Sequence, residues 1–125
     1  MGSSVLRVLV CDDSILIRKK LKDCLLSCGC SEILEAADGQ SAVDTYKEHK
    51  PDLVFMDIVM PVKGGIEAVT EILEFDGNAK VVIASSSGTK THLKKALEAG
   101  AYEFIQKPFD EAQIRNIVLN YNKEA

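Results

Sequence analysis

Long apolar runs are missing from the 125-residue sequence. No stretch approaches the ~20 apolar residues that a helix needs to cross a bilayer. The amino-terminal residues Met1-Gly2-Ser3-Ser4 contain neither the charged nor the apolar segment of a secretory signal. We therefore expect a cytoplasmic protein that does not associate with membranes.

An excess of positive charge and segments of biased composition are also missing. The chain has 15 Lys and Arg residues against 19 Asp and Glu residues, which gives a formal net charge of −4. A domain that neutralises nucleic-acid phosphates normally carries a basic excess, so the composition argues against nucleic-acid binding. At roughly 100–200 residues per domain, residues 1–125 are predicted to form a single domain.

Four cysteines are present, Cys11, Cys24, Cys28 and Cys30. Without a secretory signal the expected compartment is reducing, which argues against disulfides. The last three could lie near one metal ion, but their spacing matches no standard zinc site and both histidines are distant in sequence. Cys24 and Cys28 fall on the apolar face of a predicted helix, so we favour packing of free thiols in the core.

Short apolar segments recur along the chain and predict strands. Apolar runs without alternation are typical of parallel strands that are covered on both faces. The predicted strands are residues 5–10, 32–36, 53–56, 81–84 and 103–106, of which the second is the weakest.

Between these segments, apolar residues recur at helical spacing. The first helix is predicted to begin near Asp13 or Ser14 as N-cap and to end at Gly29. Further helices are predicted around residues 42–46, 66–73, 93–97 and 114–121. Strand and helix thus alternate five times, which predicts an α/β fold with a parallel sheet and right-handed crossovers.

Polar residues follow the predicted strands where each strand ends. Asp12 and Asp13 follow the first strand, and Asp57, Ser85 and Lys107 follow the third, fourth and fifth. In open α/β sheets ligands bind outside these carboxyl ends, so we expect the five side chains to converge. A single Asp at such a place can simply cap the next helix, and for Asp13 this alternative stays open.

The expected cluster of carboxylates needs a positive partner. Two carboxylates ~4 Å apart repel each other by about 4 kcal/mol at an effective dielectric constant near 20. Lys107 supplies one positive charge, and Mg²⁺, which binds carboxylates together with waters and a phosphate, would supply two. An Asp carboxylate can act as a nucleophile and form an aspartyl phosphate, whose oxygens Ser85 and Lys107 could hold.

Four segments resemble the receiver domain of two-component response regulators and, in size, its single-domain, chemotaxis CheY-like members. They are VLVCDDS at 8–14, DLVFMDIVMPVKGG at 52–65, VVIASSSG at 81–88 and AGAYEFIQKPF at 99–109. The resemblance covers nearly the whole chain. It implies a flavodoxin-like fold with strand order 2-1-3-4-5, in a receiver domain over residues 1–125 without an output domain.

The resemblance also implies roles for the acidic residues. Asp57 would accept a phosphoryl group from the phosphohistidine of a sensor kinase. Mg²⁺ would be held by Asp12, Asp13, Asp57 and the backbone carbonyl of Val59.

The residues of the last two strands would carry the switch. Ser85 would move toward the phosphoryl group, Phe104 would turn inward with it, and Lys107 would pair with a phosphoryl oxygen. The Lys107–Pro108 peptide bond would be cis, a form that only X-Pro bonds adopt at low cost.

The resemblance further implies a set of partners. They are a sensor histidine kinase or phosphotransfer protein, a phosphatase, and a downstream target such as the flagellar motor switch, bound by the fourth helix, fifth strand and fifth helix. The chain would be a monomer that can self-associate when activated, and it would not be an enzyme beyond slow autodephosphorylation. A phosphorelay intermediate and a receiver-like module that is not phosphorylated stay open as alternatives.

A few positions depart from the family pattern. Val59 stands where many chemotaxis regulators carry Asn, and Ser86 and Ser87 occupy variable positions after the switch residue, the first in place of the common Ala. In the family these positions influence the access of water to the acyl phosphate, so an apolar Val59 predicts a longer phosphoryl lifetime. Phe104 stands where Tyr or His is frequent, which puts in doubt any output contact that needs a phenol hydroxyl.

Two other functions fit the sequence less well. A phosphatase of the haloacid-dehalogenase type uses a DxD arrangement, whereas Asp12 and Asp13 are adjacent, and it usually carries a cap domain. A nucleotide-binding module would need a glycine-rich phosphate motif after a strand, whereas Gly64-Gly65 follows Pro61 in a turn-like segment.

Overall fold

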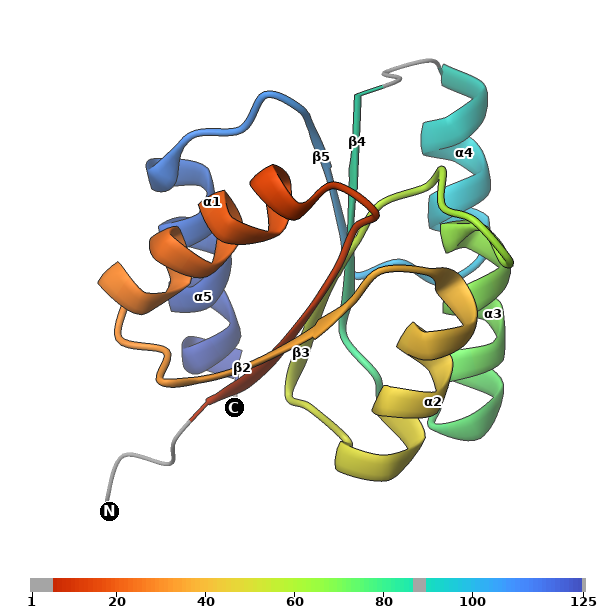
Figure 1. Cartoon of the computed structure of the whole chain (residues 1–125), viewed down its shortest axis with the longest axis horizontal. Helices are drawn as coiled ribbons and strands as arrows, with labels where there is room; N and C mark the ends of the chain where they lie inside the picture. The colour runs from red at the N-terminus through yellow and green to blue at the C-terminus, as the bar shows by residue number, and fades with distance from the viewer. Residues whose placement is uncertain (1–5, 87–89, 125) are drawn as a thin grey trace.

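The computed structural model describes residues 6–86 and 90–124 and contains one parallel sheet. Its strand order is β2-β1-β3-β4-β5, which confirms the predicted order (Figure 1). The strands are β1 (Arg7–Cys11), β2 (Glu32–Ala36), β3 (Leu53–Met56), β4 (Val81–Ser85) and β5 (Glu103–Gln106). Three strands have the predicted bounds, while β1 and β4 each end one residue later, at Cys11 and Ser85. Strand β1 begins at Arg7, so Leu6 of the predicted segment lies outside it, and Val5 lies outside the described residues.

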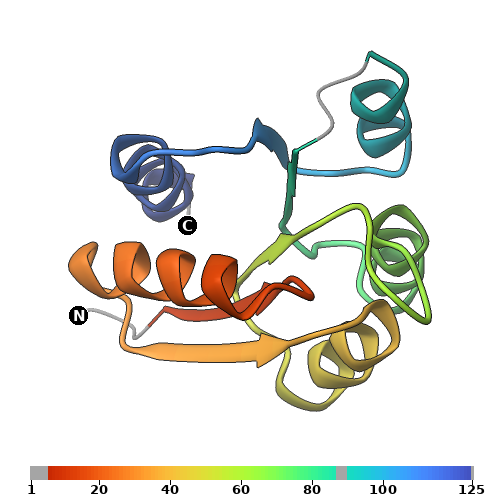
Figure 2. The same cartoon turned by 45° about the horizontal axis from the view of Figure 1, so that its top comes forward.

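Among the described residues, five helices cover the two faces of the sheet. They are α1 (Ile15–Ser27), α2 (Gly39–His49), α3 (Gly65–Phe75), α4 (Lys90–Glu98) and α5 (Glu111–Glu124). Helices α1 and α5 lie on one face, and α2, α3 and α4 lie on the other (Figures 1 and 2). Within the described part of the chain, no helix combines the length and apolar character that a membrane span requires.

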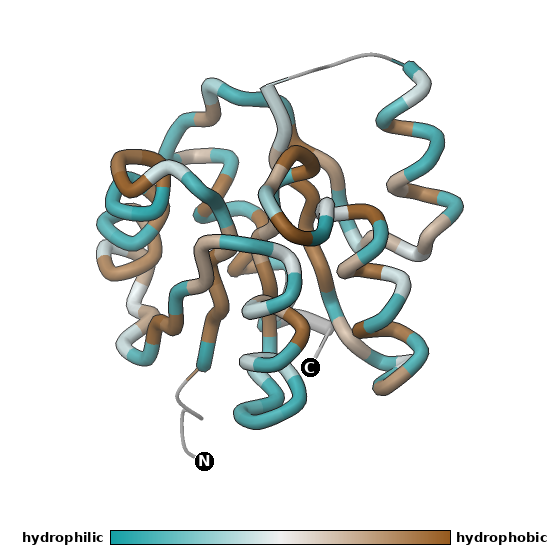
Figure 3. Tube along the Cα trace, turned by 45° about the vertical axis from the view of Figure 1, so that its right-hand side comes forward, coloured by the Kyte–Doolittle hydropathy of each residue, from teal (hydrophilic) through white to brown (hydrophobic). Residues whose placement is uncertain are grey.

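The apolar strands account for this layered arrangement. Side chains alternate across β1, so Val8 and Val10 pack in the core beneath α1 and α5, whereas Leu9 and Cys11 pack in the core on the opposite face. Strands β1, β3 and β4 are almost entirely buried, and the hydrophobic stretches of the trace run through the centre of the molecule (Figure 3). The edge strand β2 keeps charged residues on its exposed positions, which explains its weaker signal in the sequence.

The amino-terminal end of α1 decides between the two N-cap candidates. The Ser14 side chain accepts a hydrogen bond from the backbone N–H of Ile17 at 3.3 Å, so Ser14 is the N-cap. Gly29 follows the helix with a φ of 94°, as expected of a residue that ends a helix in the left-handed region. Asp13 is therefore not needed as a cap, and its carboxylate is available for another role.

The cysteines are free thiols that pack mostly in the core. Cys11, Cys24 and Cys30 are buried, and burial raises the pKa of the Cys24 and Cys30 thiols, which keeps them protonated. The predicted packing is confirmed for Cys24, whereas Cys28, the C-cap of α1, is only half-buried.

One residue of the loop between β3 and α3 has an unfavourable backbone conformation. Val62 has a φ of 69°, and the backbone N–H of Lys63 donates to the carbonyl oxygen of Pro61 across it at 2.7 Å. A β-branched residue is rarely found in this region because its side chain crowds the backbone. The Val62 side chain is 82% exposed, so little burial compensates for this cost.

We expect Val62→Asn to raise the free energy of unfolding by about 1 kcal/mol, because Asn tolerates the left-handed region better than a β-branched residue. Urea denaturation of the parent and the variant measures the change. Val62→Ile is the matched control, because it keeps the branched side chain and should give no gain. Equal stability of parent and Val62→Asn would contradict the assignment of strain to this residue.

Candidate functional site

The carboxyl ends of the central strands bring the acidic residues together. Asp12 follows β1 and Asp57 follows β3, and these strands are hydrogen-bonded neighbours. The backbone N–H of Asp57 continues the ladder and donates to the carbonyl oxygen of Cys11 at 3.0 Å. In both places an apolar strand is followed directly by an Asp. Because the two strands are parallel neighbours, both carboxylates lie at the same edge of the sheet.

Three carboxylates form a cluster at this edge. One oxygen from each of Asp12, Asp13 and Asp57 lies within 4.8 Å of the others. Asp12 and Asp57 are buried, with 2% and 9% of their surface exposed, whereas Asp13 is exposed. The cluster is therefore set into the protein on one side and open to solvent on the side of Asp13.

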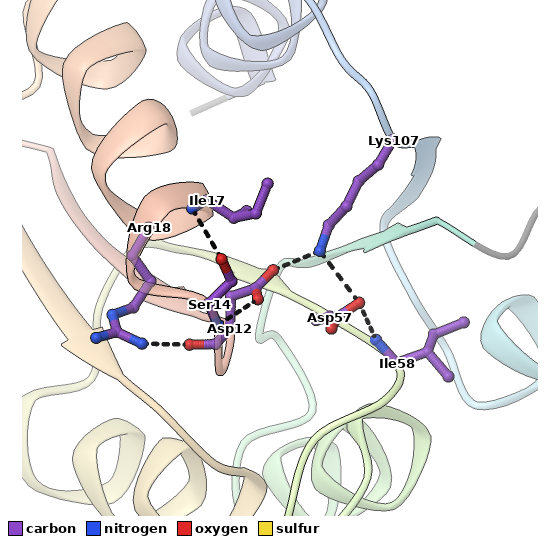
Figure 4. A network of polar contacts seen from close by, with 7 residues as sticks. All are labelled: Asp12, Ser14, Ile17, Arg18, Asp57, Ile58 and Lys107. Carbon is purple, nitrogen blue, oxygen red and sulfur yellow. Dashed lines mark hydrogen bonds and ion pairs between the residues drawn. The ribbon is translucent and has the colours of Figure 1, made fainter.

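Lys107 supplies positive charge to the two buried carboxylates. Its Nζ lies 2.5 Å from Oδ2 of Asp12 and 3.4 Å from Oδ1 of Asp57 (Figure 4). The side chain comes from the end of β5, where the Lys107 backbone N–H donates to the Ser85 carbonyl oxygen at 2.8 Å. Because the cluster contains three carboxylates and Lys107 pairs with two of them, the negative groups outnumber this positive one.

Asp57 is held by its own backbone as well as by Lys107. Its Oδ1 accepts a hydrogen bond from the Ile58 backbone N–H at 3.0 Å. Burial raises the pKa of the Asp57 carboxyl, Lys107 opposes this effect, and the neighbouring Asp12 adds to it. The ionised carboxylate is thus less stable here than in water, and an added positive charge would stabilise it.

The first residue of α3 lies against the backbone of Asp57. A Cβ atom on Gly65 would stand 2.0 Å from the Asp57 carbonyl oxygen, so no other residue fits without moving that backbone. The Gly65 N–H donates to the Ile58 carbonyl oxygen at 2.7 Å. Sequence reasoning treated Gly64-Gly65 only as part of a turn and missed this packing role, although a glycine at the start of a helix was a signal for it.

Sequence reasoning also missed Arg18. Its Nη1 donates to the carbonyl oxygen of Asp12 at 2.5 Å, and Oδ1 of Asp12 accepts from the Ser14 backbone N–H at 2.9 Å (Figure 4). Arg18 lies one turn beyond the N-cap of α1, so its position on the helix was the only signal in the sequence.

The remaining predicted residues lie in β4 and β5 or in the segments that follow β3, β4 and β5. Ser85 is buried at the end of β4, and Phe104 of β5 is partly buried against the core on the side of α4. The Val59 side chain is 68% exposed, and the Lys107–Pro108 peptide bond is cis. Ser86 is exposed, and Ser87 lies outside the described residues.

The donor set of the cluster fits a hard divalent cation. All three side chains offer carboxylate oxygens, which are the ligands that Mg²⁺ prefers in proteins, and the exposed side of the cluster can admit the waters that Mg²⁺ keeps. The surplus negative charge has the sign that favours such an ion. Asp12, Asp13 and Asp57 could therefore hold Mg²⁺.

The raised pKa of Asp57 predicts a dependence of stability on pH. Because this pKa is above the ordinary value of 3.8, the protonated carboxyl favours the folded state. This contribution is complete below the pKa in the unfolded chain and is lost as pH rises through the higher pKa of the folded protein. Without divalent cations, we expect Asp57→Asn to be more stable than the parent at neutral pH.

Thermal unfolding between pH 4 and pH 7.5 in EDTA tests this expectation, and the gain from Asp57→Asn should grow with pH. Asp44→Asn removes an exposed carboxylate on α2 and is the control. If the control gains as much as Asp57→Asn, burial of Asp57 does not cause the effect.

Comparisons with known proteins place the chain in a family. A family model for the response regulator receiver domain matches residues 8–119. Chemotaxis protein CheY of Thermotoga maritima is 44% identical over 108 residues, covering 86% of this chain and 90% of that protein. Protein CcdB of Bacillus subtilis is 45% identical over 112 residues, covering 90% and 93%.

A solved structure agrees with these relatives. The crystal structure of the CheX-CheY-BeF3-Mg+2 complex from Borrelia burgdorferi superposes with a TM-score of 0.88 at 40% identity, and the match covers 92% of this chain and 87% of that one. The chain therefore belongs to the response regulator receiver domains and is a CheY-like receiver domain of a two-component system.

Proposed function

We propose that this receiver domain is a phosphorylation-activated signalling switch and that Asp57 is its phosphoacceptor. The observation that carries the proposal is the buried Asp57 carboxylate, which lies within 4.8 Å of two further carboxylates and 3.4 Å from the Lys107 ammonium. A structural carboxylate would be neutralised by its partners, whereas this cluster keeps a surplus of negative charge. Such a site gains stability when a cation and a phosphoryl group bind together.

The reaction at Asp57 is a phosphoryl transfer. A carboxylate oxygen of Asp57 forms a bond to phosphorus while the bond from phosphorus to the donor breaks, the donor being the phosphohistidine of a sensor kinase or phosphotransfer protein. Lys107 already faces Oδ1 of Asp57, so its ammonium is placed to pair with a phosphoryl oxygen. Hydrolysis of the acyl phosphate returns the carboxylate, and we expect this to be slow without a phosphatase.

Asp12, Asp13, Asp57 and the backbone carbonyl of Val59 would hold Mg²⁺. When bound, the cation offsets the repulsion between the carboxylates and the incoming phosphoryl oxygens. The protein's own contribution is to hold two of the carboxylates in place before the ion arrives, through Lys107 and the N–H groups of Ser14 and Ile58.

The switch runs from the phosphoryl group to the surface of α4, β5 and α5. Ser85 ends β4 and Lys107 follows β5, and these strands are hydrogen-bonded neighbours. Movement of the Ser85 hydroxyl and the Lys107 ammonium toward phosphate would therefore shift both strand ends, and Phe104 on β5 would turn further inward. Helix α4 buries only Ala96 and leaves Leu93 and Leu97 39% and 54% exposed, so a population shift there changes a surface that a partner can bind.

The relatives and the exposed residues support protein partners in chemotaxis. Several relatives are named chemotaxis protein CheY, and the Borrelia CheY forms a complex with CheX. Exposed apolar side chains follow the carboxyl ends of β1 and β3, namely Ile15, Leu16, Val59 and Val62, on the same edge as Asp57. A phosphodonor or a phosphatase would bury them when it reaches Asp57, and the downstream target, for which the motor switch is our first choice, would bind the α4–β5–α5 surface.

Intact mass spectrometry after incubation with acetyl phosphate tests the phosphoacceptor. We expect one phosphoryl adduct that requires Mg²⁺, is lost in EDTA, and is absent from Asp57→Asn. If no adduct forms, binding of beryllofluoride distinguishes rapid turnover from a site that does not accept phosphate. Failure of both would leave a phosphate-independent interaction module, whereas transfer of the phosphoryl group onward to another protein would favour the phosphorelay alternative.

The exposed Val59 predicts a long-lived phosphoryl group. An apolar side chain two residues after Asp57 offers no polar group to orient an attacking water, so Val59→Asn should shorten the lifetime. Loss of the adduct after removal of acetyl phosphate measures it. Val62→Asn makes the same chemical change at an exposed position of the same loop and should leave the rate unchanged. Equal or slower loss in Val59→Asn would falsify the prediction.

A further inference from the structure

The Arg18 side chain joins three elements beneath the acidic cluster. From α1, its Nη1 donates to the carbonyl oxygen of Asp12 at 2.5 Å, a contact drawn in Figure 4. Its Nε lies 3.1 Å from Oε1 of Glu35 on the edge strand β2. The Arg18 side chain is only 13% exposed, whereas its partner Glu35 is 39% exposed, so the guanidinium is largely enclosed and the contact with the Asp12 carbonyl is its more buried one.

The carbonyl that Arg18 holds belongs to the peptide bond between Asp12 and Asp13. On the other side of Asp12, its N–H donates to the Ala36 carbonyl oxygen at 3.1 Å, which continues the ladder of β1 and β2. The chain leaves the sheet after Asp12, and among the described residues the Asp12 carbonyl oxygen accepts its hydrogen bond from Arg18 and not from a neighbouring strand. The contact with Arg18 therefore fixes the orientation of the peptide plane from which the Asp13 side chain projects.

Asp13 depends on this peptide plane more than Asp12 does. The Asp12 carboxylate is also held by Lys107 and by the Ser14 N–H. Asp13 is exposed and does not cap α1, because Ser14 does. Its place in the cluster is thus set mainly through the backbone.

The charge of Arg18 is only partly offset outside the cluster. Glu35 pairs with Arg18 and is also 3.6 Å from the Lys22 ammonium, so one carboxylate serves two cations. Its fork of donors binds a carbonyl and a carboxylate at the same time, which a lysine ammonium on a flexible stem does not reproduce. Arg18 and a lysine at the same position would therefore carry the same charge and differ in the direction of their hydrogen bonds.

We infer that Arg18 is a positioning residue for the divalent cation: by holding the peptide between Asp12 and Asp13, it arranges the carboxylates so that they bind the ion together. The inference rests on the metal site of the proposed function and names a residue that makes that site. Groups that orient metal ligands from behind commonly change the affinity for the ion without touching it.

The chain contains a matched control for this contact. Arg7 has its Nε 2.9 Å from Oε2 of Glu32 on β2, and its Nη1 donates to the His49 carbonyl oxygen at 3.1 Å. It therefore makes the same pair of contacts at the opposite end of the same two strands, where Arg7 is in register with Glu32. A change at Arg7 loosens β1 and β2 without touching the acidic cluster.

The test is an NMR titration of the ¹⁵N-labelled, unphosphorylated chain with MgCl₂, which follows the backbone amides beside the cluster. We expect Arg18→Met and Arg18→Lys each to weaken Mg²⁺ binding by about tenfold, because both lose the fork that holds the Asp12 carbonyl. Arg7→Met should bind Mg²⁺ as the parent does. Arg18→Lys keeps the stem and the charge, and it decides the question if Arg18→Met does not fold.

Each other result overturns the inference. Parent-like affinity in both Arg18 variants would mean that the contact positions nothing, and recovery by Arg18→Lys would mean that charge, not direction, matters. An equal loss in Arg7→Met would reduce the effect to general loosening of the sheet. If the parent itself binds no Mg²⁺ at these amides, the metal site of the proposed function fails, and the inference fails with it.

Discussion

Repulsion among three carboxylates at the carboxyl edge of the sheet is the constraint on which the rest of the site depends. Asp12 and Asp57 are brought there by β1 and β3, whose burial between two helical layers leaves them no freedom to move apart. Carboxylates this close destabilise one another, and burial adds to the cost at Asp57, whose pKa it raises. The fold tolerates the arrangement because Lys107 faces both buried carboxylates and because Asp13 remains in contact with water.

The same repulsion explains how a change at Asp57 can alter the structure at the ends of β4 and β5. Lys107 is shared between Asp12 and Asp57, so any group that adds charge at Asp57 or displaces Lys107 from Asp12 redistributes its contacts. Lys107 is tied through its backbone to Ser85, and β4 and β5 carry that connection to the edge of the sheet that α4 covers. A change of charge at Asp57 can therefore reach, through β4 and β5, the surface of α4 with its exposed leucines. A modest difference in partner affinity between two conformational states is then enough to make a switch.

Much of this was predictable because buried parallel strands and their carboxyl ends have a direct signature in the sequence. The bounds of β2, β3 and β5 agree with the predicted segments, and Asp12, Asp57 and Lys107 follow strands whose ends must meet at one edge. The other features of the site depend on tertiary contacts, which cannot be predicted from the spacing of apolar residues in the sequence. Neither the contact of Arg18 with the Asp12 carbonyl nor the absence of room for a Cβ at Gly65 follows from spacing. The choice between Asp13 and Ser14 as N-cap likewise needed the backbone geometry, since either side chain can cap a helix.

Arg7 and Arg18 show how position turns the same chemistry into different roles. Each guanidinium pairs with a glutamate of β2 and donates to a backbone carbonyl, so each ties the edge strand to a neighbouring segment. At Arg7 the carbonyl belongs to the end of α2, and the contact serves only the packing of the sheet. At Arg18 the carbonyl belongs to the peptide that joins two acidic residues, so the geometry of that contact is passed on to the site. Arg18 thus acts on the charged cluster from behind it, through the backbone carbonyl of Asp12 and not through a carboxylate.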